Sequence, residues 1–329
     1  MSEPLVSVIM PAYQAAPYIE ACVSSVLEQS YTKFELIIIN DGSTDQTDTI
    51  LKKIDDPRLR LVSSDKNKGY THRLREALAM AKGKYIARLD ADDRCHRDRL
   101  ESQVRAFEQD ENLVLCGSSC RLIDGQGKII GEKHHPTDER LIQWVMLLDN
   151  PLQHPSVMIR KSVLDDRGIN FNPDYEPTED FKLWSDLSRT GKVVNLSDLL
   201  IDYRIHAEQV SRERRQRQLQ QHDRVVMENL EPYEGVWQHD EAIRQGMREL
   251  EQGSSLSEIK CIEAESLLKA YLELYSAFDQ GQKHAAVTTY VAKRVKRLWN
   301  HSKTLSERLI ILRTTIQQQP GVFIEGFFI

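Results

Sequence analysis

The sequence predicts an α/β fold, in which a mostly parallel central sheet is flanked by helices, followed by an α-helical C-terminal extension. From residue 5 to about 110, short apolar runs alternate with longer segments of helical period. Runs such as FELIIIN are almost wholly apolar, as is typical of strands that are covered on both faces. After residue 211 the strand-like runs stop. We therefore expect two domains, residues 1–211 and residues 212–329.

The first domain opens with a regular alternation of strands and helices. The strands are expected at 5–10, 34–40, 58–64 and 84–89, and the helices at 18–27, after DGSTDQT, and at 69–81. In DGSTDQT, three residues can cap the helix that follows: Ser43, Thr44 and Asp45. In such sheets ligands bind outside the carboxyl ends of the strands. The loops PAY, NDGSTD and DADD are therefore expected to meet at one crevice.

Beyond Asp110 the pattern becomes mixed. We expect a strand at LVLCGSS, a hairpin at RLIDGQGKII, a helix over 138–148, a strand over 156–160 and a short helix within PTEDFKLWSDLSRTG. KVVNL and LLIDYRI are interpreted as two further short strands. The C-terminal region is expected to be helical near 222–231, 238–251, 256–279 and 284–318.

Composition excludes several classes of protein. The 44 basic and 50 acidic side chains give a net charge of −6, which disfavours a general nucleic-acid binder. Five cysteines without metal-type spacing suit a reducing cytoplasm. The N-terminus lacks the pattern of a signal peptide, and no window approaches the roughly 20 apolar residues that span a bilayer. We expect a cytoplasmic protein that is at most peripheral to the inner face of a membrane.

Three carboxylates follow the strand YIARL within four residues: Asp90, Asp92 and Asp93. Like charges this close raise one another's pKa unless a positive charge lies between them. Mg²⁺ and Mn²⁺ prefer such hard oxygen ligands together with substrate phosphates. Taken alone, these carboxylates could equally be caps of the helix that follows.

Two other acidic positions are candidates for function. Asp41 lies two positions after the apolar run LIII, where it could accept hydrogen bonds from a base or ribose or belong to a plain turn. Glu179 and Asp180 begin a short helix, where a carboxylate either complements the helix dipole or acts as a general base.

Seven motifs, taken together in their order along the chain, are specific enough to indicate a protein family. VSVIMPAY, ELIIINDGSTD, NKG, KGKYIARLDADD, HPSVMIRKSVL, TEDFKLW and YRIHAEQVS occur in this order over residues 5–211. In this the chain resembles an inverting glycosyltransferase of family 2, with the fold called GT-A, of the type that assembles bacterial surface polysaccharides. The resemblance implies transfer of a sugar from a nucleoside diphosphate, here expected to be UDP, to the hydroxyl of a saccharide or lipid-linked acceptor, with Mn²⁺ or Mg²⁺.

The resemblance also assigns roles to residues of this sequence. It implies that Asp180 is the general base, with Glu179 beside it, and that Asp92, Asp90 and His206 bind the metal. It implies that the nucleotide is bound by Pro11, Ala12, Tyr13, Asp41 and Asp90, and that Arg204 contacts the diphosphate. His206 could instead be a structural hydrogen-bonding residue, His154 is interpreted as a core histidine, and Arg73 and Arg75 as a solvated face.

Two alternatives share this fold. A nucleotidyltransferase would favour a loop rich in Gly and Lys after the first strand, which PAYQAAPY lacks. A non-catalytic nucleotide-binding protein would have no use for a base, so the combination of DADD and TED disfavours it.

The C-terminal region lies outside the resemblance. Residues 291–313 carry seven basic side chains and one acidic, Glu307. Such a helix could lie on an anionic membrane or pack in a bundle with a basic solvated face. We expect this region, with the apolar tail GVFIEGFFI, to serve packing, oligomerisation or membrane association.

Overall fold

One mixed β-sheet organises the computed structural model, which describes residues 3–206, 215–233, 264–282 and 284–301 and the single positions 311, 315, 319 and 322. Within these residues the strand order is β3-β2-β1-β4-β8-β6-β9-β5, with β7 paired to β6. The strands are β1 Val6–Ala12, β2 Phe34–Asp41, β3 Leu59–Ser64, β4 Tyr85–Arg88, β5 Arg94–Cys95, β6 Leu113–Ile123, β7 Ile129–Lys133, β8 Met158–Arg160 and β9 Lys192–Arg204.

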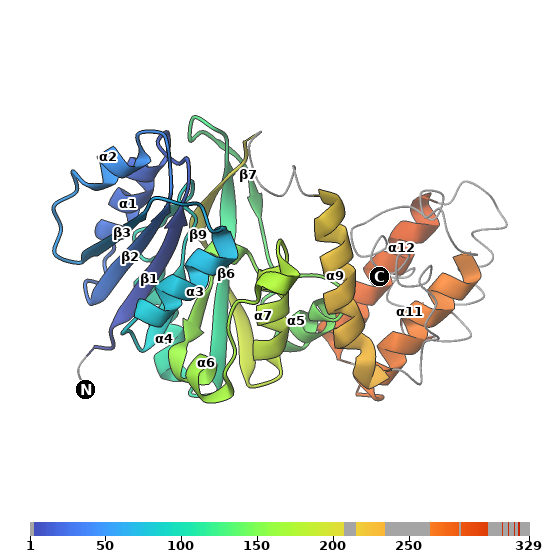
Figure 1. Ribbon diagram of the computed structural model, residues 1–329. Coiled ribbons are helices and arrows are strands. Elements are labelled where there is room, and N and C mark those ends of the chain that lie inside the picture. Colours follow the sequence, from blue (N-terminus) through green and yellow to red (C-terminus); the bar gives the residue numbers. More distant parts are fainter. Residues whose placement is uncertain are drawn as a thin grey trace. The chain divides into compact units, whose positions relative to one another are not determined.

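The helices lie mainly between these strands along the chain. The α-helices are α1 Ile19–Leu27, α2 Thr47–Leu51, α3 Tyr70–Met80, α4 Arg99–Gln109, α5 Glu139–Met146, α6 Lys161–Arg167, α7 Glu179–Ser188, α9 Arg215–Leu230, α11 Ala264–Asp279 and α12 Ala285–His301. Short 3₁₀ turns are η1 His154–Ser156, η2 Pro173–Tyr175 and η3 Glu231–Tyr233. Figure 1 follows them in chain order.

The first four strands in the sheet order form its parallel part. Val6 of β1 lies opposite Phe34 of β2 on one side and Tyr85 of β4 on the other, so β1 is central. Strand β8 then pairs antiparallel to β4, and β6 antiparallel to β8. The sequence-based prediction of this part of the fold is confirmed.

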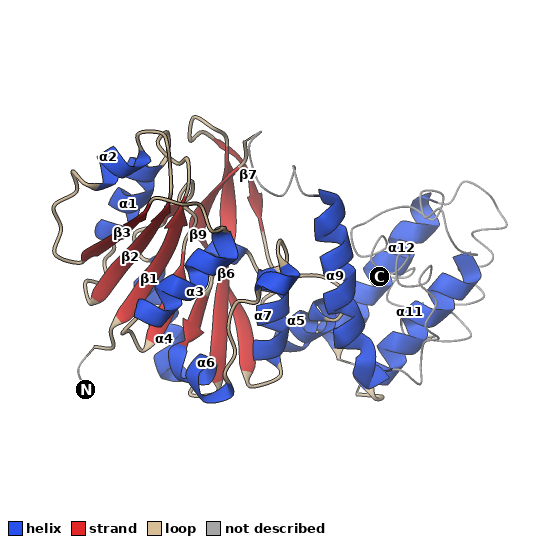
Figure 2. Ribbon diagram, in the orientation of Figure 1, coloured by secondary structure: helices blue, strands red, loops and turns tan. Residues whose placement is uncertain are grey.

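Alternate residues of β1, β2 and β4 are buried on opposite faces of the sheet, whereas no residue of the edge strand β3 is fully buried. Val8 and Met10 belong to the hydrophobic core that includes residues of α1 and α4. Ile9 and Ile37 are fully buried, and α3 packs against β1 and β2. Helix α3 crosses the front of the sheet in Figure 2. Cover on both faces explains why these strands are mostly apolar.

Three details differ from the sequence interpretation. β1 continues through Pro11 and Ala12, which were expected in a loop. The two expected short strands after residue 191 form one strand of 13 residues, β9, whose pairing with β6 changes register at several places. A short strand, β5, precedes α4.

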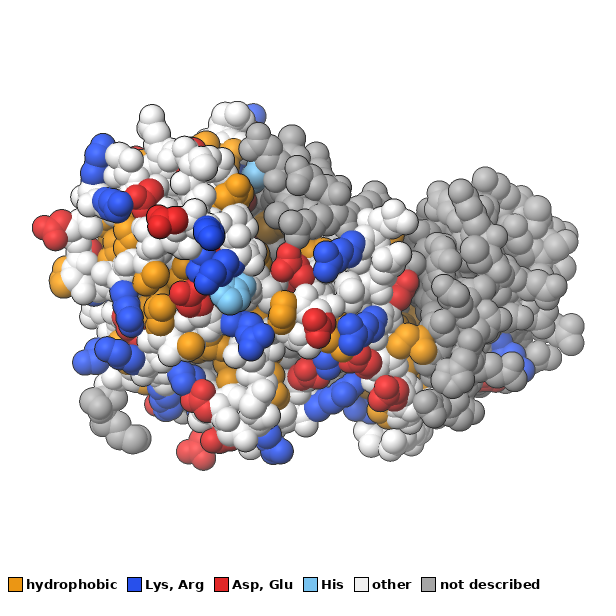
Figure 3. Space-filling view, viewed as in Figure 1, with side chains coloured by type: hydrophobic (Ala, Val, Ile, Leu, Met, Phe, Trp, Pro, Cys, Tyr) orange, Lys and Arg blue, Asp and Glu red, His pale blue; other side chains and the backbone are white. Residues whose placement is uncertain are grey.

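The described chain divides into two compact units, residues 1–139 with 151–221 and residues 140–150 with 222–329. The boundary at 211 remains a prediction, and the expected helix near 238–251 and the tail at 321–329 lie almost wholly outside the described residues. On the visible face of the first unit, acidic and basic side chains are intermixed (Figure 3).

The second unit has an aromatic centre. Trp144 of α5 is fully buried, and its ring lies 5.3 to 6.1 Å from those of Tyr271, Tyr275 and Phe278. Val291 and Val295 of α12 are also fully buried, so these two positions serve packing. Among the described helices, none is both long and apolar enough to cross a bilayer.

Candidate functional site

The carboxyl ends of β1, β2 and β4 bring three predicted motifs to one edge of the sheet. Ala12 of β1 lies opposite Asn40 of β2, and Ile9 lies opposite Arg88 of β4. The loops after β1 and β2 are also joined directly. Gln14 donates a hydrogen bond from its backbone N–H to Ser43 Oγ, at 3.0 Å.

The three aspartates after β4 form a compact acidic cluster. Candidate ligand oxygens of Asp90, Asp92 and Asp93 all lie within 4.8 Å of one another. Burial, and then the charges of Asp92 and Asp90, raises the pKa of Asp93 well above its ordinary value. Burial, and then Asp90, also raises the pKa of Asp92. The closeness of the three carboxylates therefore disfavours the charged forms of Asp92 and Asp93.

Two residues at the end of β9 hold this cluster. The backbone N–H of Arg204 donates to Asp93 Oδ1 at 2.7 Å, and its Nε atom donates to the backbone oxygen of Asp92 at 2.7 Å. His206 Nε2 lies 2.9 Å from Asp92 Oδ2. The guanidinium of Arg204 also lies 4.6 Å from the centre of the Tyr18 ring. Arg204 is thus a structural support of the loop, and its contact with a diphosphate remains a prediction.

Asp41 is buried and bound by the protein itself. Its carboxylate accepts hydrogen bonds from the backbone N–H groups of Lys68 and Gly69 and from Arg73 Nε, at 2.8, 2.9 and 2.6 Å. Arg73 is only 2% exposed, so its interpretation as part of a solvated face is wrong. The role of Asp41 in reading the base remains a prediction.

The residues expected to contact the nucleotide differ in exposure. Pro11 and Ala12 are buried strand residues, whereas Tyr13 is 52% exposed. An exposed aromatic ring next to a polar loop is suited to stacking on a base. Of the three residues, Tyr13 has the exposed side chain, and the nucleotide contacts of all three remain predictions.

Glu179 and Asp180 occupy the first turn of α7. Burial, and then the charge of Asp180, raises the pKa of Glu179 to about 8. Burial raises the pKa of Asp180 as well, and the charge of Asp90 contributes to that rise. A carboxylate with a raised pKa is a stronger base, so this pair has the property that a general base needs.

Helix α3 links the aspartate cluster to the approach to α7. Tyr70 Oη donates to Asp90 Oδ1 at 3.0 Å, and Thr71 Oγ1 donates to Glu176 Oε2 at 3.0 Å. Arg88 also binds Asp90 and lies 5.2 Å from the centre of the Tyr70 ring. The first turn of α3 therefore connects the aspartate cluster after β4 with Glu176, which precedes α7.

The sequence interpretation missed the position of His154. Its Nδ1 atom lies 3.6 Å from Asp180 Oδ2, and its Nε2 atom is buried without a hydrogen-bond partner among the described residues. His154 and Asp180 are 26 positions apart, and only the placement of β8 beside β4 brings η1 to this site.

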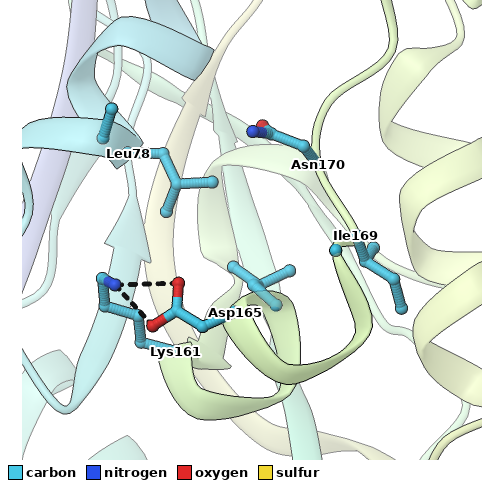
Figure 4. A pocket seen from close by; sticks show the side chains of 8 residues that line it. Leu78, Lys161, Asp165, Ile169 and Asn170 are labelled. Atoms are coloured by element: carbon cyan, nitrogen blue, oxygen red, sulfur yellow. Dashed lines mark hydrogen bonds and ion pairs between the residues drawn. The ribbon is translucent and has the colours of Figure 1, made fainter.

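A hollow of about 340 Å³ lies away from these groups. Figure 4 shows Leu78 of α3, the Lys161–Asp165 ion pair of α6 and the following Ile169 and Asn170 around it. Leu78 is about 12 Å along α3 from Tyr70, at a rise of about 1.5 Å per residue. The hollow is therefore not part of the site at the strand ends.

The donor set at the aspartate cluster fits a hard divalent cation. Carboxylate oxygens are the ligands that Mg²⁺ and Mn²⁺ prefer, and Asp93 Oδ2 is a buried oxygen without a hydrogen-bond partner in the described part of the chain. A cation would offset both the burial and the repulsion between carboxylates that raise the pKa values of Asp92 and Asp93. These groups are suited to bind a diphosphate through a metal.

Comparisons with known proteins agree with this geometry. The family described as Glycosyl transferase family 2 matches residues 7–168. An uncharacterized glycosyltransferase of Haemophilus influenzae is 35% identical over 240 residues, which cover 70% of this chain and 74% of that protein. The UDP-Glc:alpha-D-GlcNAc-diphosphoundecaprenol beta-1,3-glucosyltransferase WfaP of Escherichia coli is 32% identical over 209 residues, which cover 63% of this chain and 80% of that protein.

Two solved structures share the fold. TarS 1-349 of S. aureus in complex with UDP-GlcNAc has a TM-score of 0.58 at 17% identity and covers 95% of this chain and 92% of its own. The mannosyltransferase PcManGT from Pyrobaculum calidifontis in complex with GDP-Man and Mn²⁺ has a TM-score of 0.57 at 18% identity and covers 97% of this chain and 88% of its own.

The sheet order and the acidic strand-end loop define an α/β enzyme of the GT-A fold. The chain belongs to glycosyltransferase family 2, as the H. influenzae relative and the matching family show. It is a glycosyltransferase, and the resemblance drawn from the sequence is confirmed.

Proposed function

We propose that this enzyme transfers a sugar from a UDP-sugar to an acceptor hydroxyl with inversion, using Mn²⁺ or Mg²⁺, in the assembly of a surface polysaccharide or glycolipid. The observation that carries the proposal is the aspartate cluster at the end of β4, bridged by the first turn of α3 to the approach to the carboxylates of α7. The UDP-linked name of WfaP and the UDP-GlcNAc complex of TarS support the choice of UDP.

In this proposal Asp90 and Asp92 would hold the metal, together with His206. The cation, when bound, neutralises charge that develops on the leaving diphosphate. Arg204 keeps the loop in place through the backbone of Asp92 and Asp93. Tyr13 stacks on the base.

Asp180 acts as the general base. The acceptor oxygen attacks the anomeric carbon, the bond from that carbon to the diphosphate oxygen breaks, and its electron pair leaves with UDP. The hydroxyl proton passes to the carboxylate of Asp180. Glu179, with a pKa of about 8, remains protonated near neutral pH and so limits the negative charge beside Asp180.

The location follows from the proposed acceptor. A saccharide growing on a lipid carrier would be reached from the cytoplasmic face of a membrane, where nucleotide sugars are available. We propose that the second unit has a structural role through its packed helices. It could in addition bind the membrane or a second copy of the chain.

The test is a transfer assay with a panel of UDP-sugars and Mn²⁺, in which release of UDP is measured and the product anomer is identified by NMR. Where no sugar acceptor is known, the slow transfer of the sugar to water is measured instead. Asp180→Asn should lower turnover by about 10²- to 10⁴-fold, as removal of a general base does. Asp165→Asn, an exposed carboxylate on α6, is the control. A product with retained configuration, or full activity of Asp180→Asn, would contradict the proposal.

A further inference from the structure

The surroundings of His154 set it apart from a simple core residue. Its ring centre lies 5.8 Å from that of Trp184, 6.1 Å from that of Tyr70 and 6.3 Å from that of Phe171. The Trp184 and Tyr70 rings meet it nearly edge-on, at 75° and 86°. Three aromatic contacts from α7, α3 and the segment after α6 fix the plane of the imidazole.

The fixed ring directs one nitrogen to the proposed base. His154 Nδ1 lies 3.6 Å from Asp180 Oδ2, and both side chains are less than 20% exposed. This separation is slightly longer than a hydrogen bond, and contacts of this kind shorten when a substrate fills an active site. The imidazole is therefore within reach of the carboxylate.

The charge state of His154 follows from its neighbours. Burial, and then the charge of Arg88 on β4, lowers its pKa well below the ordinary value of 6.5, so the ring is neutral at pH 7. Charged groups that act on Asp180 or Glu179 in this region include Asp90 after β4 and Glu176 before α7. A neutral imidazole carries its proton on one nitrogen only.

The two ring nitrogens have different electrostatic surroundings. Nδ1 is the nitrogen near a carboxylate oxygen, where a proton is favourable. Nε2 is buried without a hydrogen-bond partner in the described residues, and so are the Nε and Nη1 atoms of Arg88. The positive charge of Arg88 disfavours any further proton on the ring. The tautomer with the proton on Nδ1 is the one that can donate to Asp180.

We propose that His154 is a positioning residue, which donates its Nδ1 proton to Asp180 and fixes the orientation of that carboxylate for the acceptor hydroxyl. This proposal rests on the proposed function, because it takes Asp180 as the base. One carboxylate oxygen can accept from the imidazole while lone pairs remain for the incoming proton. His154 itself neither gains nor loses a proton during transfer.

The first test needs no substrate. Nitrogen-15 NMR of the histidine rings distinguishes the Nδ1–H from the Nε2–H tautomer, and the signal of His154 is assigned by its loss in His154→Asn. We expect a neutral ring with the proton on Nδ1 from about pH 6 to 8, with a changed Nδ1 shift in Asp180→Asn. A proton on Nε2, a charged ring at pH 7, or shifts unaffected by Asp180→Asn would overturn the proposal.

The second test compares two amides. The side-chain nitrogen of Asn reaches the position of Nδ1, whereas that of Gln reaches the position of Nε2. His154→Asn should keep turnover with UDP-GlcNAc, UDP-glucose or UDP-galactose and Mn²⁺ within about fivefold of the wild type. His154→Gln should lower kcat by about 10²-fold, the cost of a misplaced catalytic group, with KM for the donor unchanged.

The outcomes separate this proposal from the proposed function. Equal losses in both His154 variants, or a change confined to KM, would show a packing role and overturn the inference. If none of these donors is turned over, the NMR result alone decides whether His154 donates to Asp180. If Asp180→Asn keeps full turnover while the tautomer is as expected, the assignment of the base is wrong and the contact remains.

Discussion

Replacement of Arg73 by Met tests the buried ion pair behind the nucleotide loop. Arg73 Nε lies 2.6 Å from Asp41 Oδ1, and the two side chains are 2% and 4% exposed. Removal of one partner of a buried pair costs about 3 to 5 kcal/mol, because the other charge stays buried alone. Asp41 would keep two backbone hydrogen bonds, from Lys68 and Gly69. We therefore expect Arg73→Met to lower the free energy of unfolding by about 3 kcal/mol, near the lower end of this range.

The same helix offers a matched control. Arg75 is exposed, and Arg75→Met should change stability by less than about 0.5 kcal/mol. Since the chain has two compact units, the assay must report on the first unit alone. Urea-dependent hydrogen exchange, read by mass spectrometry on peptides from β2 and α3, meets that need. Equal effects of the two substitutions would refute the reasoning.

Three further changes have defined outcomes. Glu179→Gln should remove a pH dependence. The folded pKa of about 8 exceeds the unfolded value, so the stability of the wild type falls as pH rises from about 5 to 8. The variant should lose less stability over this range, as measured by hydrogen exchange on peptides from α7 in the first unit. Gly83→Ala should cost about 1 to 3 kcal/mol, because its Cβ would lie 2.5 Å from the backbone nitrogen of Ser7. Asp93→Asn should raise the melting temperature of the metal-free protein, because it relieves repulsion with Asp92, and should reduce the further rise on addition of Mn²⁺.

Each of these has a control or a contradicting result. Parallel pH profiles of wild type and Glu179→Gln would show that Glu179 does not carry the raised pKa. Gly131→Ala, where the nearest atom is 3.6 Å away, should cost much less than Gly83→Ala. A lower melting temperature of metal-free Asp93→Asn would contradict the repulsion that the cluster geometry implies.

Strands β1, β2 and β4 were predictable because they are short, mostly apolar and buried on both faces. β9 was not, because the exposed Ser197 and Asp198 interrupt its apolar pattern and changes of register accommodate them. A sequence shows an interruption, but it does not show that a neighbouring strand continues the pairing across it.

The acidic positions of the site were found because each directly follows a strand or begins a helix. Partners from distant segments were not found. The burial of Arg73 depends on Asp41, which lies 32 positions earlier on another element. One feature of the sequence could have indicated that Arg73 is buried. Arg73 closely follows NKG and lies between Thr71 and Leu74, which are buried, on a helix that begins near the acidic end of β2.

Calorimetric titration of UDP measures whether a divalent cation takes part in donor binding at the aspartate cluster. Wild type, Asp92→Asn and the exposed control Asp98→Asn would be titrated with and without Mn²⁺, beside GDP. The account predicts that Mn²⁺ tightens UDP binding at least about tenfold in wild type and Asp98→Asn but not in Asp92→Asn, with weaker binding of GDP. UDP binding that ignores Mn²⁺, or a full metal effect in Asp92→Asn, would contradict it.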